Sequence, residues 1–113
     1  MGIYFILKGN EITTTSDILE WGKFMEGQER LIKQERLKIK DKKYFVSTVF
    51  LGLDHGFSFL ETSSKPVLFE TMIFPEDDNK EEWEEYQTRC CTKEEALKQH
   101  QEAIEWLENH KPL

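Results

Sequence analysis

The segment Tyr44–Phe74 constrains the fold more than any other, because it holds two dense apolar runs typical of β-strands. Tyr44–Leu53 alternates two largely apolar faces, which predicts a strand in the centre of a sheet. Val67–Phe74 predicts the next strand, and Pro75 stops it. The connection that opens at Asp54 has about a dozen residues, which is long for a hairpin and indicates a functional loop.

The N-terminal residues predict a hairpin followed by a helix. Ile3–Leu7 and Glu11–Thr15 are short β-type runs on either side of a Gly-Asn turn signal. Thr14 precedes Asp17 by three residues, a spacing typical of a helix start. One helical face follows, which Gly27 can end, and we expect it to cover one face of the sheet. This face consists of Ile18, Trp21, Phe24 and Met25.

The charged stretch Arg30–Ile39 fits either a helix or an exposed strand. Asp41-Lys42-Lys43 resembles a turn directly before the strand that starts at Tyr44, and a short turn most simply joins antiparallel strands. A strand is therefore favoured, and its charges suit a sheet edge or a solvated face.

The C-terminal third predicts a polar loop and a long helix. Trp83 and Tyr86 are interpreted as docking a short helical turn onto the body of the protein. Thr92 and Glu95 have the spacing of a capping box, in which each side chain satisfies a free backbone amide. A stripe at helical spacing follows, and the helix should fray before Pro112. The stripe consists of Ala96, His100, Ala103, Ile104 and Leu107.

These patterns predict one α+β domain spanning residues 1–113, with an antiparallel sheet of four to five strands. One helix near the N-terminus and one C-terminal helix pack on that sheet. Eight Phe, three Trp and three Tyr exclude a disordered chain. No apolar run approaches the roughly 20 residues that span a bilayer. The start lacks the basic region of a secretory signal, so no membrane contact is expected.

Cys90 and Cys91 are adjacent, which disfavours both a disulfide and a zinc site. Both are interpreted as reduced thiols of a cytoplasmic protein.

The net charge of −7 lies entirely in the C-terminal third. Residues 1–75 contain ten Lys or Arg and ten Asp or Glu, whereas residues 76–113 contain five and twelve. Such a surface repels nucleic-acid backbones, so direct nucleic-acid binding is not expected. It either imitates a nucleic acid, with carboxylates in place of phosphates, or is a solvated helix face and loop. The second reading is favoured because acidic helices are common.

Asp54 and His55 are the first candidates for chemistry. A carboxylate beside an imidazole can bind a metal, move protons or hold a ligand. The favoured alternative is a turn in which Asp54 accepts backbone amides and Gly56 adopts an unusual dihedral.

Glu70 and Thr71 lie within an otherwise apolar strand, where a buried carboxylate needs a partner unless it faces water. His100 lies on the apolar stripe, and a core histidine is favoured there over a ligand. Asp54, His55, Glu70 and His100 could in principle form a metal or hydrolytic site, but nothing in their spacing requires one.

Aromatic residues in or beside loops suit stacking on a base, with nearby cations such as Arg89 neutralising a phosphate. The alternative is a satellite core under the long loop. No Gly-rich phosphate loop, nucleophile elbow or metal-ligand motif is present, so no cofactor and no metal are expected. The aromatic residues are Phe57, Phe59, Trp83 and Tyr86, and the other nearby cations are Lys65 and Lys93.

Three segments, VSTVFLGLDHGF, PVLFETMIF and TKEEALKQHQEAI, resemble a family of small proteins widespread in bacteriophage genomes and prophages. The opening YFILKGNEITTTSDILEWGKFME also looks like that family, so the resemblance covers nearly the whole chain, and its core motif from Val46 to His55 is specific. The loop from Gly56 to Lys65 departs from the Gly/Pro-rich version expected there. The resemblance implies a phage or prophage origin and a role in the cytoplasm of an infected bacterium. It carries over no catalytic residues.

Small phage proteins outside the virion often act against host defences, an association that favours binding over catalysis. The first hypothesis is therefore a non-enzymatic counter-defence protein, a homo-oligomer that sequesters a small nucleotide immune signal. The second is an inhibitor that binds a host defence protein through the acidic last third of the chain, with Trp83 and Tyr86 among its carboxylates. Charge reversal at Glu81, Glu82, Glu84 and Glu85 should then abolish inhibition. The third is a small hydrolase that uses Asp54 and His55, with or without a metal. The predicted ligand-binding residues are Asp54, His55, Phe57, Glu70, Thr71, Arg89 and His100.

Overall fold

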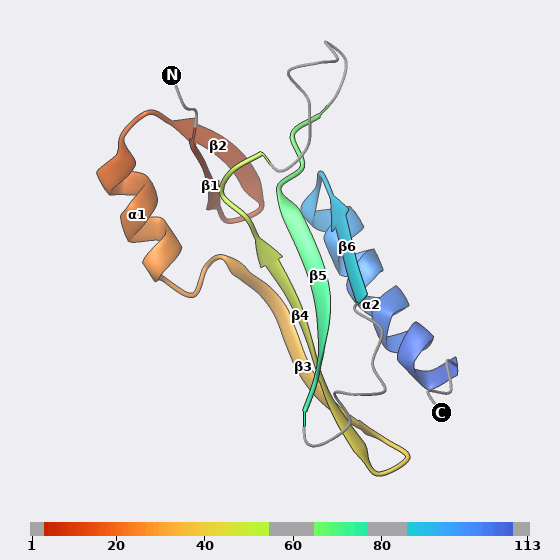
Figure 1. The fold of residues 1–113 in the computed structure, drawn as a ribbon. Coiled ribbons are helices and arrows are strands. Elements are labelled where there is room, and N and C mark those ends of the chain that lie inside the picture. The colour runs from red at the N-terminus through yellow and green to blue at the C-terminus, as the bar shows by residue number, and fades with distance from the viewer. Residues whose placement is uncertain (1–3, 55–64, 77–85, 110–113) are drawn as a thin grey trace.

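The computed structural model describes residues 4–54, 65–76 and 86–109 (Figure 1). The predicted α+β class is confirmed, but the strands form two antiparallel sheets instead of one. The smaller sheet is the β1–β2 hairpin, and the larger has the order β3-β4-β5-β6. The elements are β1 Tyr4–Lys8, β2 Glu11–Thr15, α1 Ile18–Glu26, β3 Leu31–Ile39, β4 Lys42–Phe50, β5 Phe69–Pro75, β6 Tyr86–Cys90 and α2 Lys93–Asn109.

Strand β4 lies between β3 and β5, as its two apolar faces predict. The ambiguous stretch before it is strand β3, at an edge of the larger sheet, as favoured from the sequence. The turn between β3 and β4 is Lys40–Asp41, one residue earlier than predicted, because Ile39 already pairs with Lys42. Both turn residues have positive φ, 51° and 68°, which a two-residue hairpin with the twist of its strands requires.

Helix α2 covers one face of the larger sheet and lies behind it in Figure 1. Its Ala103 and Leu107 pack with Val46 of β4 and Ile73 of β5 in one core cluster. Because side chains alternate along a strand, the residues between these point to the opposite side. Helix α1 packs on β1 and β2, and its Phe24 contacts Phe50 of β4 on the side that α2 occupies. Neither described helix therefore covers the opposite side, which we call the open face.

The β1–β2 hairpin and α1 are fastened to the sheet at Gly52. Its carbonyl oxygen accepts hydrogen bonds from Phe5 N at 3.0 Å and Trp21 Nε1 at 3.1 Å. The prediction of the helix start at Thr14 is wrong. Asp17 is the N-cap, because its carboxylate accepts the amides of the first turn, including that of Leu19 at 2.9 Å.

The capping box of α2 is confirmed, with Thr92 N to Glu95 Oε1 and Glu95 N to Thr92 Oγ1 both at 3.1 Å. The predicted helical turn at Tyr86 is wrong. Tyr86 instead begins β6, because its backbone pairs with Ile73 and its ring packs on Trp106 at 4.9 Å. Trp83 lies outside the described residues. Neither described helix has the length and apolar composition that a membrane span requires.

Candidate functional site

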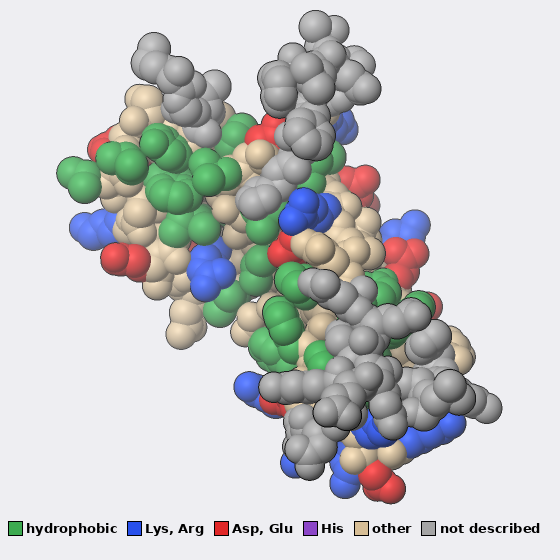
Figure 2. All heavy atoms as spheres, viewed as in Figure 1, with side chains coloured by type: hydrophobic (Ala, Val, Ile, Leu, Met, Phe, Trp, Pro, Cys, Tyr) green, Lys and Arg blue, Asp and Glu red, His purple; other side chains and the backbone are tan. Residues whose placement is uncertain are grey.

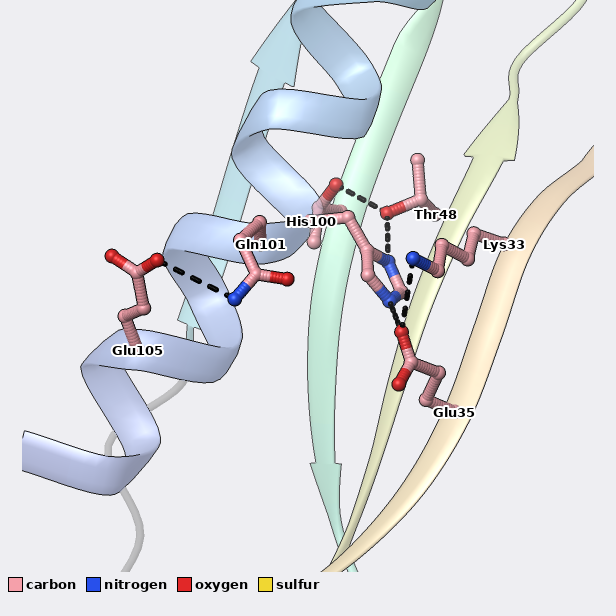
Figure 3. A network of polar contacts seen from close by, with 7 residues as sticks. Lys33, Glu35, Thr48, His100, Gln101 and Glu105 are labelled. Carbon is pink, nitrogen blue, oxygen red and sulfur yellow. Dashed lines mark hydrogen bonds and ion pairs between the residues drawn. The ribbon is translucent and has the colours of Figure 1, made fainter.

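A chain of polar contacts crosses the core between α2 and the sheet (Figure 3). His100 is completely buried, with Nδ1 2.7 Å from Thr48 Oγ1 and Nε2 3.0 Å from Glu35 Oε1. Thr48 Oγ1 also lies 2.6 Å from Thr71 Oγ1. Lys33 approaches the same Glu35 oxygen at 3.4 Å. These polar contacts thus link helix α2 to strands β3, β4 and β5.

Burial lowers the pKa of His100, and this effect outweighs the opposing hydrogen bond and charge of Glu35. The buried ring is therefore neutral near pH 7. Because a carboxylate only accepts hydrogen bonds, Nε2 carries the proton and donates to Glu35, and Nδ1 accepts from the Thr48 hydroxyl. The Thr48 side chain has no exposed surface, so a substrate in solution cannot reach its hydroxyl. The arrangement orients α2 on the sheet, in agreement with the interpretation of His100 as a core histidine.

Glu70 lies on the open face, whereas its neighbour Thr71 points into the core. Its Oε2 accepts from Arg89 Nε at 2.8 Å and from Gln87 Nε2, and these residues belong to the adjacent strand β6. Glu70 and His100 therefore lie on opposite sides of the sheet, so the suggested site that joins these two residues is wrong.

Of the remaining predicted residues, the structure describes Asp54. Asp54 Oδ1 accepts from Val67 N at 2.8 Å, so this carboxylate accepts a backbone amide, but from a residue 13 positions further along the chain and not from within a local turn. His55 and Phe57 lie outside the described residues. No group of three His, Cys, Asp or Glu side chains within residues 4–54, 65–76 and 86–109 could hold a metal ion.

The two cysteines are free thiols, as predicted. Burial raises the pKa of Cys90 to about 11, and the nearby Glu95 carboxylate adds to this effect. The same two causes raise the pKa of Cys91. Both groups are therefore thiols near neutral pH, which disfavours a nucleophilic role.

An aromatic pair lies on the open face, where β4 and β5 run side by side. The rings of Phe45 and Phe74 are stacked, with centroids 6.2 Å apart and planes inclined by 29°. The Arg36 guanidinium lies over the Phe45 ring at 4.7 Å, and Phe74 is 42% exposed. Figure 2 views this side of the sheet and shows hydrophobic side chains gathered over β4 and β5. A planar, electron-rich surface with an adjacent cation is suited to an aromatic ligand.

A basic cluster adjoins this pair toward the tip of the β3–β4 hairpin. Lys38 and Lys43 face each other across the two strands, and both are exposed. Residues 36–43 contain five cations and one carboxylate, although the whole protein has a net charge of −7. Figure 2 shows blue side chains at this end of the molecule.

Two features were not predicted from the sequence, namely the aromatic pair of Phe45 and Phe74, which we call the platform, and the basic cluster, which contains Arg36, Lys38 and Lys43. Comparing charge over two long segments averaged the basic cluster with the acids around it. A short sliding window of charge would have found it. The aromatic pair was hidden because its rings come from strands that were interpreted as core.

Comparison with known proteins gives no match, whether with protein-family models, curated proteins or solved structures.

Proposed function

We propose that the protein is a non-enzymatic phage counter-defence protein that binds and sequesters a small nucleotide on the open face of its larger sheet. The observation that carries this proposal is the stacked pair of Phe45 and Phe74 with Arg36 over one ring. Bases stack on such rings with little dependence on their identity, and a neighbouring guanidinium strengthens the contact. The resemblance to phage proteins supports the setting, which is the cytoplasm of an infected bacterium.

The groups around the platform favour binding over catalysis. The carboxylate of Glu70 is already held by Arg89 and Gln87, and the His100 imidazole lies on the other side of the sheet, where it contacts Thr48. A retained, unaltered ligand is the expected result of such an arrangement. A sheet face encloses a ligand poorly, so the proposal includes a homo-oligomer in which a second copy closes the site.

The test measures binding of cyclic and ADP-ribose-type nucleotides by calorimetry and by native mass spectrometry. The protein should retain a nucleotide whose mass is unchanged after incubation and should bind it as an oligomer. The exposed ring is the informative target, so Phe74→Ser should weaken binding at least tenfold. Leu19→Ser is the matched control, because Leu19 is 80% exposed and lies on α1. Conversion of the ligand, or no binding by the wild type, would overturn the proposal.

A second candidate function is inhibition of a host defence protein by an acidic surface. The outward side of α2 supports it, because a row of carboxylates is exposed there opposite the buried stripe. The row consists of Glu94, Glu102, Glu105 and Glu108. The other acidic part of the last third, residues 81–85, lies outside the described part of the chain.

The two functions predict opposite responses to paired variants in an infected host. Glu102→Lys with Glu105→Lys should abolish counter-defence if α2 binds a protein, and the effect of wild-type protein should weaken with salt in vitro. The same variants should leave nucleotide retention intact. Loss of counter-defence with Phe74→Ser alone would favour sequestration.

A further inference from the structure

Two lysines of the basic cluster are placed so close together that their repulsion lowers the stability of the folded protein. Lys38 and Lys43 are directly opposite in the β3–β4 register and lie on the same side of the sheet. Like charges in that position repel each other and destabilise a strand pair. The acidic protein has many carboxylates, yet neither lysine forms an ion pair with another described residue. Local rules of this kind are typically broken at functional sites.

The basic cluster lies directly beside the aromatic pair on the same face of the sheet. Arg36 pairs with Phe45, and Phe45 pairs with Phe74. Phe45 and Phe74 therefore form the next set of paired residues on the same face as the two lysines, two residues further along the strands. Residues i and i+2 of a strand, which share one face, are about 7 Å apart, since each residue advances about 3.4 Å. This separation corresponds to the reach of a ribose between a base and its phosphates.

We propose that Lys38 and Lys43 form a subsite for the phosphates of a nucleotide that carries at least two phosphate groups. The inference rests on the proposed function, in which Phe45 and Phe74 hold the base. Two ammonium groups on adjacent strands each donate three hydrogen bonds and can bind separate anionic groups. Arg36 adds a third positive charge, although Glu76 lies 3.5 Å from its guanidinium. A diphosphate satisfies this set of charges better than a single phosphate does.

The experiment compares adenosine, AMP and ADP as probes of the full-length protein by calorimetry at two salt concentrations. Wild-type protein should bind ADP at least tenfold more tightly than adenosine, with AMP between them. Lys38→Gln with Lys43→Gln should remove that preference and flatten the salt dependence, while adenosine affinity stays within twofold. Lys23→Gln with Lys98→Gln is the control, because both residues are exposed lysines on the helices. Equal melting temperatures would exclude misfolding as the cause.

A separate titration with inorganic pyrophosphate distinguishes failure of the subsite from failure of the proposed function. If adenosine and ADP bind equally well to both proteins, the subsite proposal is wrong and base binding stands. If no nucleoside or nucleotide binds but pyrophosphate binds only when both lysines are present, the subsite stands and base binding on the platform is wrong. If neither class of probe binds, both proposals are wrong.

Discussion

Thr48 and His100 meet in the core, with 2.7 Å between the threonine Oγ1 and the histidine Nδ1. The directions of all the hydrogen bonds in this group follow from Glu35, which can only accept. His100 donates to Glu35, Thr48 donates to His100, and Thr71 donates to Thr48. Every polar hydrogen of the three buried side chains therefore has an acceptor. Helix α2 is thus held in one register by directional contacts in addition to apolar packing.

Thr48→Val should destabilise the fold by about 1–3 kcal/mol, because it leaves Nδ1 of His100 and the Thr71 hydroxyl without partners in the core. Urea denaturation measures the change. Thr88→Val is the matched control on the same side of the sheet. The Thr88 hydroxyl is buried without a hydrogen-bond partner, so its removal should be neutral or stabilising. Equal losses in the two variants would contradict a stabilising role of the Thr48 hydrogen bonds.

Stability should fall on mild acidification, because the pKa of His100 is lower in the folded protein than its usual value near 6.5. Below pH 6.5 the histidine binds a proton more readily in the unfolded chain than in the folded protein, so acidification favours unfolding. The contribution is complete above pH 6.5 and is lost as pH falls through the folded-state pKa. His100→Gln should be less stable at pH 7.5 and should lose less stability between pH 7 and 5. A folded-state pKa above 6.5, measured by NMR, would sink this prediction.

Gly52→Ala should loosen the attachment of the β1–β2 hairpin and α1. Gly52 has a φ of 77°, and an added Cβ would lie 2.8 Å from both Met25 Sδ and Trp21 Nε1. The methionine can move aside, but moving the indole breaks its hydrogen bond to the Gly52 carbonyl. We expect a loss of about 2–4 kcal/mol from backbone strain and overpacking together.

A double-mutant cycle with Trp21→Phe checks that explanation, because phenylalanine keeps an aromatic ring but lacks the N–H group. The cost of Gly52→Ala should be smaller in the Trp21→Phe background than in the wild type. Additive losses would show that the indole does not contribute to the cost of Gly52→Ala. Hydrogen exchange should also show earlier opening of α1 than of α2 in Gly52→Ala.

The sequence was informative where local chemistry decides the structure. The Thr92 and Glu95 box marks the start of α2, and the two apolar faces of β4 mark the central strand, because both signals need only near neighbours. The error at Tyr86 arose because a strand of five residues has little periodicity, and its pairing with β5 is a long-range contact. The platform was missed for the same reason. Phe45 and Phe74 become neighbours only through strand register, which no local pattern encodes.

A glycine in the Lys40–Asp41 turn should stabilise the protein, because both residues occupy the left-handed region with φ of 51° and 68°. That conformation is costly for residues with a Cβ, and the second position of such turns strongly favours glycine. Asp41→Gly should therefore stabilise the protein by about 0.5–1 kcal/mol in urea denaturation, even after the greater flexibility of glycine in the unfolded chain. Gly9→Ala tests the opposite change in the β1–β2 hairpin. Because Gly9 has a φ of 65°, this variant should lower the stability of the protein by a comparable amount. Destabilisation by Asp41→Gly would mean that the aspartate side chain supports the turn by more than its backbone costs.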